Sequence, residues 1–161
     1  MNRRTFLTNS TAALLLIPVA HSCAMQGAAD ASGQTAKAIP SSALLQPAEL
    51  AQMLNTAGKP LMLQIGSHVL YAEAHVPGSE YAGAAGTSAG LQTLRERVSG
   101  LRKDQDIVLY CGCCPWGRCP NIRPAYELLQ TLGFTHVRAL YLADNFGADW
   151  VNKGYVVAKG R

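Results

Sequence analysis

Residues 107–119 read Ile107-Val108-Leu109-Tyr110-Cys111-Gly112-Cys113-Cys114-Pro115-Trp116-Gly117-Arg118-Cys119, an apolar strand pattern that passes into a cysteine-rich loop. Four of the chain's five cysteines lie here, and a helix is expected to open near Asn121. A turn from strand to helix exposes backbone N–H groups and the positive end of a helix dipole. Both favour the thiolate, the reactive form of cysteine. The segment therefore predicts sulfur chemistry, and the competing interpretation is a loop held by disulfides without catalysis.

Predicted helices and strands alternate around this segment. In chain order they are a helix from residue 47 that ends before 58, a strand over 61–65, a turn at Pro77-Gly78, a helix over 91–101, the strand Ile107–Tyr110, a helix from 121 closed by Gly133, the strand Val137–Leu140, a short helix over 149–152 and an edge strand over 155–157. This alternation predicts an α/β fold with a parallel sheet covered on both faces. Ligands of such sheets bind at the carboxyl ends of strands, where Cys111 directly follows Tyr110.

Four segments carry a family resemblance. They are Leu63-Gln64-Ile65-Gly66 at a strand end, Tyr71-Ala72-Glu73-Ala74-His75-Val76-Pro77-Gly78 as a turn box, Ile107-Val108-Leu109-Tyr110-Cys111, and Leu132-Gly133-Phe134 followed by Val137, Trp150 and Gly154. In this order and spacing they resemble a single-domain rhodanese, a sulfurtransferase family. The resemblance covers residues 43–157 and implies a three-layer α/β fold, with a mostly parallel sheet and helices on both faces.

The resemblance assigns a role to the first cysteine of the loop. Cys111 matches the family's persulfide-forming nucleophile, because it follows the strand that delivers that residue. The resemblance implies a sulfurtransferase that needs no cofactor, takes sulfane sulfur from thiosulfate or a persulfide, and passes it to a thiol acceptor. Arg118 and Arg123 are candidates for binding an anionic donor, and a solvated surface position is the alternative for each. A monomer is expected.

The chain departs from the family mainly in the loop. The predicted active-site loop consists of Cys111, Gly112, Cys113, Cys114, Trp116, Gly117, Arg118 and Cys119; it is longer than the family's loop and holds three further cysteines. Gln64 and Gly66 stand where the family has Asp and Arg. Trp116 is expected either to cover the pocket or contact a partner, or to pack onto the domain. These departures concern the sulfur donor and acceptor more than the fold.

The extra cysteines leave three alternatives open. Cys111 and Cys114 form a Cys-x-x-Cys pair, which is typical of a thiol–disulfide oxidoreductase with Cys114 as the resolving thiol. Cys114 and Cys119 are expected to form a disulfide, since Pro115 and Gly117 allow a compact turn between them. A zinc, copper or iron–sulfur site is the third alternative. Because four ligands from consecutive residues are difficult to arrange around one ion, no metal ligand is predicted.

The N-terminal residues resemble a targeting segment. Residues 1–24 combine Arg3-Arg4 with an apolar run and small residues, in the order of an export signal of twin-arginine type, and ordinary secretion is the alternative. Cys23 lies in a weak lipoprotein box, so a lipid-anchored form is a second possibility. Residues 25–42 are predicted to be a flexible linker and residues 43–161 the folded domain. The expected location is the bacterial periplasm, an oxidising compartment.

Charge excludes one class of partner. The chain carries a formal net charge of +4, and removal of Arg3 and Arg4 with the signal leaves +2. The remaining lysines and arginines are scattered and do not interleave with aromatic residues, so nucleic-acid binding is not expected. No membrane contact is expected after signal removal unless Cys23 is lipidated.

Overall fold

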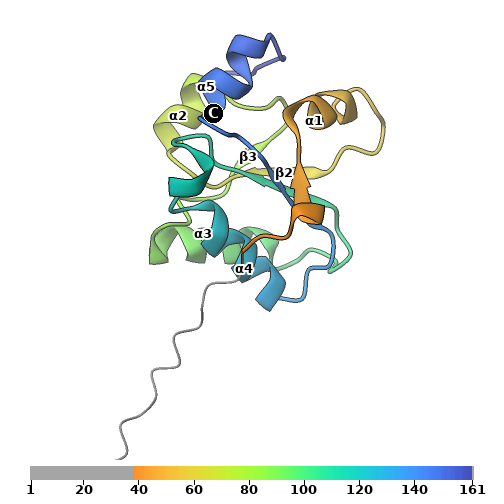
Figure 1. Ribbon diagram of the computed structural model, residues 1–161. Helices are drawn as coiled ribbons and strands as arrows, with labels where there is room; N and C mark the ends of the chain where they lie inside the picture. The colour runs from red at the N-terminus through yellow and green to blue at the C-terminus, as the bar shows by residue number, and fades with distance from the viewer. Residues whose placement is uncertain (1–37, 161) are drawn as a thin grey trace, which may run out of the picture. The chain divides into compact units, whose positions relative to one another are not determined.

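Five parallel strands form one sheet in the computed structural model, which describes residues 38–160 (Figure 1). Their order is β1-β5-β4-β2-β3, and their bounds are Leu44–Leu45 (β1), Leu61–Gln64 (β2), Glu80–Tyr81 (β3), Ile107–Tyr110 (β4) and Val137–Leu140 (β5). The central strand β4 pairs with β2 on one side and β5 on the other, with Tyr110 opposite Gln64 and Leu109 opposite Ala139. The parallel sheet confirms the predicted fold class.

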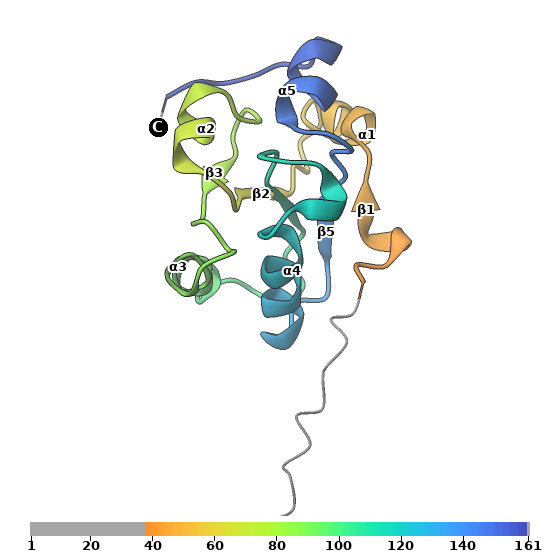
Figure 2. The same ribbon diagram turned by 60° about the vertical axis from the view of Figure 1, so that its left-hand side comes forward.

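Helices cover both faces of this sheet. Their bounds are Pro47–Met53 (α1), His68–Glu73 (α2), Ser88–Val98 (α3), Ile122–Thr131 (α4) and Phe146–Asp149 (α5), with 3₁₀ turns at Ser41–Ala43 (η1), Trp116–Arg118 (η2) and Val151–Lys153 (η3). α3 and α4 lie in the lower half of Figure 2, and α1 and α5 lie in its upper half. Side chains of α3 and α4 contribute to one hydrophobic cluster, and those of α1 and α5 contribute to the other. The described domain therefore has the predicted three layers.

Alternate residues of β4 join the two clusters. Ile107 and Leu109 pack with the side chains of α3 and α4, whereas Val108 and Tyr110 pack with those of α1 and α5. All four side chains are buried, as expected for the central strand of a covered parallel sheet. This burial fixes the register of β4 and hence the position of the residue that follows it.

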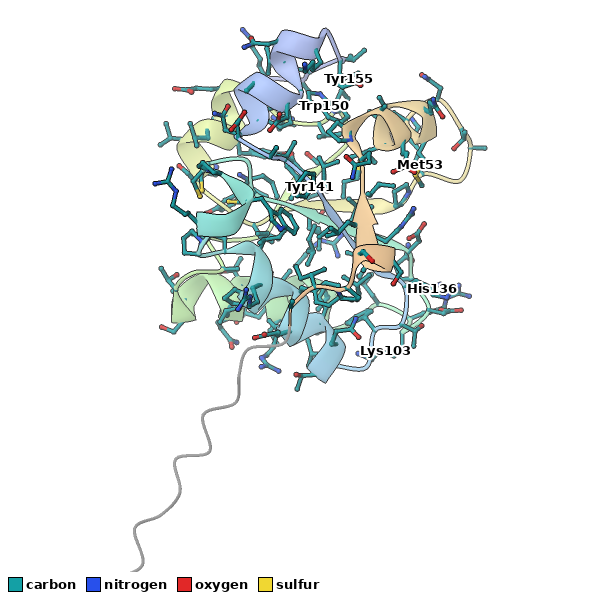
Figure 3. All side chains as sticks on the ribbon, viewed as in Figure 1. Met53, Lys103, His136, Tyr141, Trp150 and Tyr155 are labelled. Atoms are coloured by element: carbon teal, nitrogen blue, oxygen red, sulfur yellow. The ribbon has the colours of Figure 1, made fainter. Side chains whose placement is uncertain are left out.

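The last segment of the domain differs from the prediction. The predicted edge strand over 155–157 was wrong, since those residues form no strand and only the neighbouring Ala158 makes an isolated bridge, to His75. The buried Trp150 explains the difference, because its indole N–H donates to the carbonyl of Val156 at 2.9 Å and its ring packs on Tyr155 (Figure 3). The chain thus wraps around Trp150 instead of pairing with the sheet.

The predicted export signal, residues 1–24, and most of the predicted linker lie outside the described residues. Within the linker's described end, Ile39 packs against the cluster under α3 and α4, and Ser41 begins η1. Across residues 38–160, no helix has the length and apolar character needed to cross a membrane.

Candidate active site

Cys111 lies at the carboxyl end of the central strand, where the sheet places ligands. Its side chain is buried, and the next residue, Gly112, has a φ of 75°. A Cβ atom on Gly112 would stand 2.5 Å from the Cβ of Phe146, whose backbone N–H donates to the Gly112 carbonyl. Only glycine therefore allows the chain to turn here against α5.

The loop then folds back across its own start. Trp116 begins η2, its backbone N–H donates to the carbonyl of Ala143, and its ring lies 5.2 Å from that of Tyr141. Trp116 thus packs onto the domain, which was one of the two expectations for it. This return of the chain carries Cys119 beside Cys111, although the two residues are eight positions apart.

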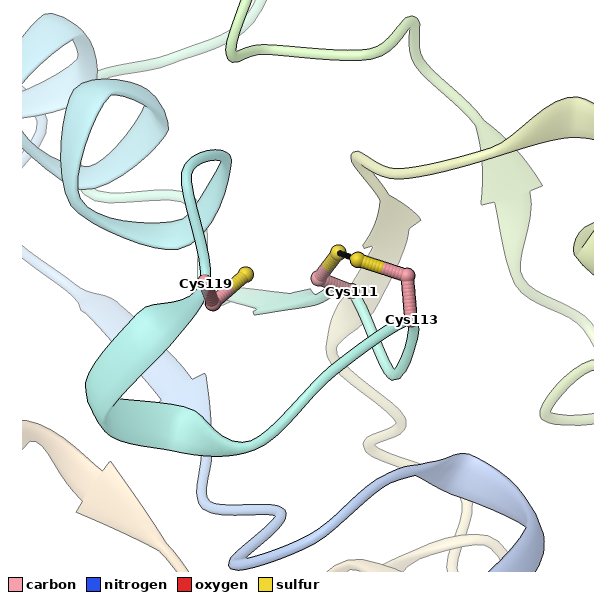
Figure 4. Close-up of side chains that lie close together, drawn as sticks. All are labelled: Cys111, Cys113 and Cys119. Carbon is pink, nitrogen blue, oxygen red and sulfur yellow. Dashed lines mark hydrogen bonds between the residues drawn. The ribbon is translucent and has the colours of Figure 1, made fainter.

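Four sulfur atoms gather at this point. The Sγ atoms of Cys111 and Cys113 are 3.1 Å apart, and those of Cys113 and Cys114 are 3.2 Å apart. The sulfurs of Cys111, Cys113 and Cys119 all lie within 4.8 Å of one another (Figure 4). The loop therefore brings sulfurs together more closely than we expected for cysteines from one short segment.

No disulfide joins these thiols. Within residues 38–160 all four cysteines are free, so the expected bond between Cys114 and Cys119 is not present in the structure. The sulfur of Cys119 instead accepts hydrogen bonds from the backbone N–H groups of Asn121 and Ile122, at the start of the next helix. The N-terminus of α4 thus holds the Cys119 sulfur.

The two ends of the loop differ in acidity. Hydrogen bonding with the Cys111 thiol, together with the two backbone N–H groups of α4, lowers the pKa of Cys119 to about 5. The same hydrogen bond and burial raise the pKa of Cys111 above its ordinary value. The sequence predicted a thiolate at the helix N-terminus, and the geometry favours it at Cys119.

Asn121 is a site residue that the sequence reasoning missed. It was predicted as a helix cap and stands at that position, but its buried side chain makes no capping hydrogen bond. Its Nδ2 donates to the sulfur of Cys111 at 3.2 Å and to that of Cys113 at 3.7 Å, while its Oδ1 accepts from the backbone N–H of Gly86 at 2.7 Å. An amide side chain directly at the end of a cysteine loop was the only signal available.

Gln64 and Gly66 contact Cys111 from the neighbouring strand and its end. The Gln64 amide donates to the Cys111 carbonyl at 3.2 Å and accepts from the Gly66 backbone N–H at 3.2 Å. A Cβ atom on Gly66 would stand 2.7 Å from the sulfur of Cys111. The two residues that replace the family's Asp and Arg therefore fix the backbone of Cys111 and leave room for its sulfur.

A cavity of about 290 Å³ opens over Cys111 and Cys113. Its walls include the apolar side chains of Leu70, Phe146 and Val151, and its one charged lining residue among those described is Glu73. Arg118 and Arg123 are exposed on η2 and in the first turn of α4, and neither lines this cavity. Their role in donor binding, and that of Gly117 and the other loop residues, stays a prediction.

The model of the rhodanese-like domain family matches residues 46–142 of this chain. The chain belongs to the rhodanese-like domain family. The match includes β2, β4, the whole cysteine loop and β5, so the family is assigned on the segment that holds the site.

Solved rhodanese-like domains show the same fold. A domain from Anabaena sp. is 21% identical with a TM-score of 0.55, covering 73% of this chain and 79% of that one. A protein from Bacillus halodurans is 19% identical with a TM-score of 0.55, covering 71% and 75% of the two chains, and a rhodanese-like domain protein from Staphylococcus aureus is 13% identical with a TM-score of 0.50, covering 73% and 98%. No curated protein matches the chain.

Proposed function

We propose that this rhodanese-like domain is a sulfurtransferase that forms a persulfide on Cys111 and passes sulfane sulfur to a thiol acceptor. The observation that supports this most directly is the position of the Cys111 sulfur, which stands at the end of β4, faces a cavity and accepts a hydrogen bond from the Asn121 amide. A buried nucleophile with an open approach and a fixed donor is the arrangement that covalent catalysis requires.

The reaction consists of two exchanges at sulfur. Cys111 first gives its proton to the Cys119 thiolate, with which it shares a hydrogen bond. The Cys111 thiolate then attacks the outer sulfur of the donor, forming a new S–S bond as the donor's own bond to that sulfur breaks and its remainder leaves as an anion. The acceptor thiolate then attacks the terminal sulfur of the Cys111 persulfide, which regenerates the Cys111 thiolate. The Asn121 amide lies within hydrogen-bond distance of the Cys111 sulfur, which carries negative charge before the first exchange and again after the second.

The cavity favours an organic persulfide over thiosulfate as the donor. Its described lining combines the apolar side chains of Leu70, Phe146 and Val151 with the carboxylate of Glu73. A dianion such as thiosulfate would be desolvated there without a paired cation, which is costly. A persulfide on an apolar carrier would instead bury its carbon atoms against these walls.

We also propose that the protein is exported, because residues 1–24 have the order of an export signal. In an oxidising compartment a persulfide donor and a thiol acceptor must both be delivered by reducing partners. Export and partners rest on the sequence alone.

A second candidate function follows from the shortest contact in the loop. The sulfurs of Cys111 and Cys113 are 3.1 Å apart, within reach of a disulfide after a small shift. A thiol–disulfide role would therefore pair Cys111 with Cys113 and not with Cys114, the partner expected from the Cys-x-x-Cys spacing. Here one of the two thiolates attacks a partner disulfide and releases one partner thiolate, and the other resolves the mixed disulfide and releases the second. Alternatively Cys113 attacks the inner sulfur of the Cys111 persulfide and releases hydrosulfide. Both routes end in a Cys111–Cys113 bond.

Mass spectrometry separates these two functions. We incubate the reduced protein anaerobically with an alkyl persulfide, block free thiols and map the peptide that contains Cys111. The sulfurtransferase should gain one sulfur, about 32 Da, on Cys111, and should lose it to an added thiol. A loss of two hydrogens with a Cys111–Cys113 link, and no sulfur retained, would establish the redox role and reject the transferase.

Replacement of Gly66 tests the spacing around the nucleophile. In Gly66→Ala the added Cβ meets the Cys111 sulfur at 2.7 Å, so that sulfur must move. Because small misplacements of reacting atoms are costly, we expect sulfur transfer to fall about 10- to 100-fold, as measured by steady-state kinetics. Gly100→Ala is the matched control, since a Cβ there meets nothing within 4 Å. Equal rates in both variants would show that the Cys111 sulfur has room to spare.

A further inference from the structure

Three of the four sulfurs in the loop surround one point. Cys111 is held at the end of β4, Gly112 turns Cys113 back toward it, and the fold-back through η2 brings in Cys119 (Figure 4). Their Sγ atoms lie within 4.8 Å of one another, and those of Cys111 and Cys113 are 3.1 Å apart. The loop thus presents three sulfur atoms of the same kind to a common centre.

The structure assigns to Cys111, Cys113 and Cys119 a three-coordinate thiolate site for a soft, sulfur-loving ion, and we propose Cu(I) as its occupant. This site goes beyond sulfur transfer, because it requires no donor and no acceptor.

The spacing fits a trigonal ion. Metal–sulfur bonds of about 2.3 Å place three sulfurs about 4.0 Å apart around a planar centre. The Cys111 and Cys113 sulfurs are 3.1 Å apart, and no pair among the three exceeds 4.8 Å. Each sulfur reaches the ideal position with a shift of less than about 1 Å. No change of backbone topology is needed, since the three sulfurs already lie within 4.8 Å of one another.

The donor set selects the class of ion. The group contains thiols only, and soft thiolate ligands favour Cu(I) and Zn(II) over hard cations such as Mg²⁺ or Ca²⁺. Structural zinc sites take four ligands in a tetrahedron. Cys114 lies outside the group, although its sulfur is 3.2 Å from that of Cys113 and interacts with that of Cys119. The three sulfurs of the group match the trigonal coordination that Cu(I) accepts.

The surroundings supply the supporting shell and a way in. Asn121 donates to the sulfurs of Cys111 and Cys113, and the backbone N–H groups at the start of α4 donate to that of Cys119, so each ligand has a hydrogen-bond partner. The cavity over the loop is lined by Cys111 and Cys113, which gives an ion access from solvent. Binding replaces thiol protons by the ion and releases those protons to solvent.

Sharing of Cys111 has a functional consequence. A sulfur that ligates Cu(I) cannot attack a persulfide donor, so a bound ion and a persulfide on Cys111 exclude each other. The site would therefore make sulfur transfer sensitive to copper, whereas ion binding itself is measurable without any sulfur donor.

Anaerobic titration of the full reduced chain with Cu(I), in competition with bathocuproine disulfonate, tests the proposal. We expect one ion per chain and three sulfur neighbours by X-ray absorption. Cys119→Ser should weaken Cu(I) binding at least about tenfold, whereas the matched variant Cys114→Ser should leave the affinity unchanged. Circular dichroism checks the fold of each variant, and Cys113→Ser, expected to weaken binding equally, replaces Cys119→Ser should that variant unfold.

Three outcomes would overturn the trigonal Cu(I) site. The first is a Cu(I) affinity in Cys119→Ser and Cys113→Ser equal to that of the unmodified chain. The second is a loss of Cu(I) affinity in Cys114→Ser as large as that in Cys119→Ser. The third is Zn(II) binding that is tighter than Cu(I) binding and has four sulfur neighbours. None of these measurements involves sulfur transfer, so failure of the metal site and failure of the proposed enzymatic function are distinguishable.

Discussion

Cys111→Ser is expected to abolish sulfur transfer and to leave the domain folded. A serine hydroxyl is far less acidic than a thiol and forms no stable equivalent of a persulfide, so the covalent intermediate is lost outright. We expect the transfer rate to fall by at least about three orders of magnitude, as is usual when a covalent nucleophile is removed. The measurement is the rate of sulfur transfer from an alkyl persulfide to a small thiol, with the persulfide product quantified by chromatography.

Thermal unfolding of Cys111→Ser serves as the structural control. Serine is only slightly smaller than cysteine, and its hydroxyl can still accept a hydrogen bond from the Asn121 amide. The melting temperature should therefore stay close to that of the unmodified chain. If Cys111→Ser kept full transfer while Cys114→Ser lost it, the nucleophile would be Cys114 and the assignment of Cys111 from the end of β4 would fail.

Two central strands of the sheet were predictable from the sequence because their apolar patterns are strong. The strands Ile107–Tyr110 and Val137–Leu140 have the predicted bounds, since each is a short apolar run between turn residues. The two-residue strands β1 and β3 and the helix α2 were not predicted. Two residues are too few to show alternation, and α2 lies in a segment whose apolar residues, Val69 and Leu70, stay exposed.

The site was predictable in location but not in detail. The topology places a ligand-binding position directly after the central strand, and Cys111 stands there as expected. Which thiols meet depends on the path of the loop, and sequence spacing does not encode that path. The Cys-x-x-Cys spacing favoured Cys114 as the partner of Cys111, whereas the turn at Gly112 directs Cys113 to it.

Asn121→Asp is expected to slow sulfur transfer about 10- to 100-fold. The substitution preserves size and keeps an oxygen for the backbone N–H of Gly86, but it removes the amide N–H that donates to the Cys111 sulfur. A hydrogen bond to a charged group contributes about 1.5–3 kcal/mol, and each 1.36 kcal/mol corresponds to a tenfold change in rate. The added carboxylate also repels the anionic sulfur, so the loss should lie toward the upper end of that range.

Alkylation of Cys111 by iodoacetamide separates this electrostatic effect from an effect on donor binding. The reagent is small and uncharged, so its rate with Cys111 reports the reactivity of the sulfur itself, and we expect that rate to fall in Asn121→Asp as transfer does. Asn55→Asp, on an exposed turn after α1, adds the same charge away from the loop and should change neither rate. A normal alkylation rate in Asn121→Asp would mean that Asn121 only joins α4 to Gly86, and the sulfur of Cys111 would then be activated by other groups of the loop.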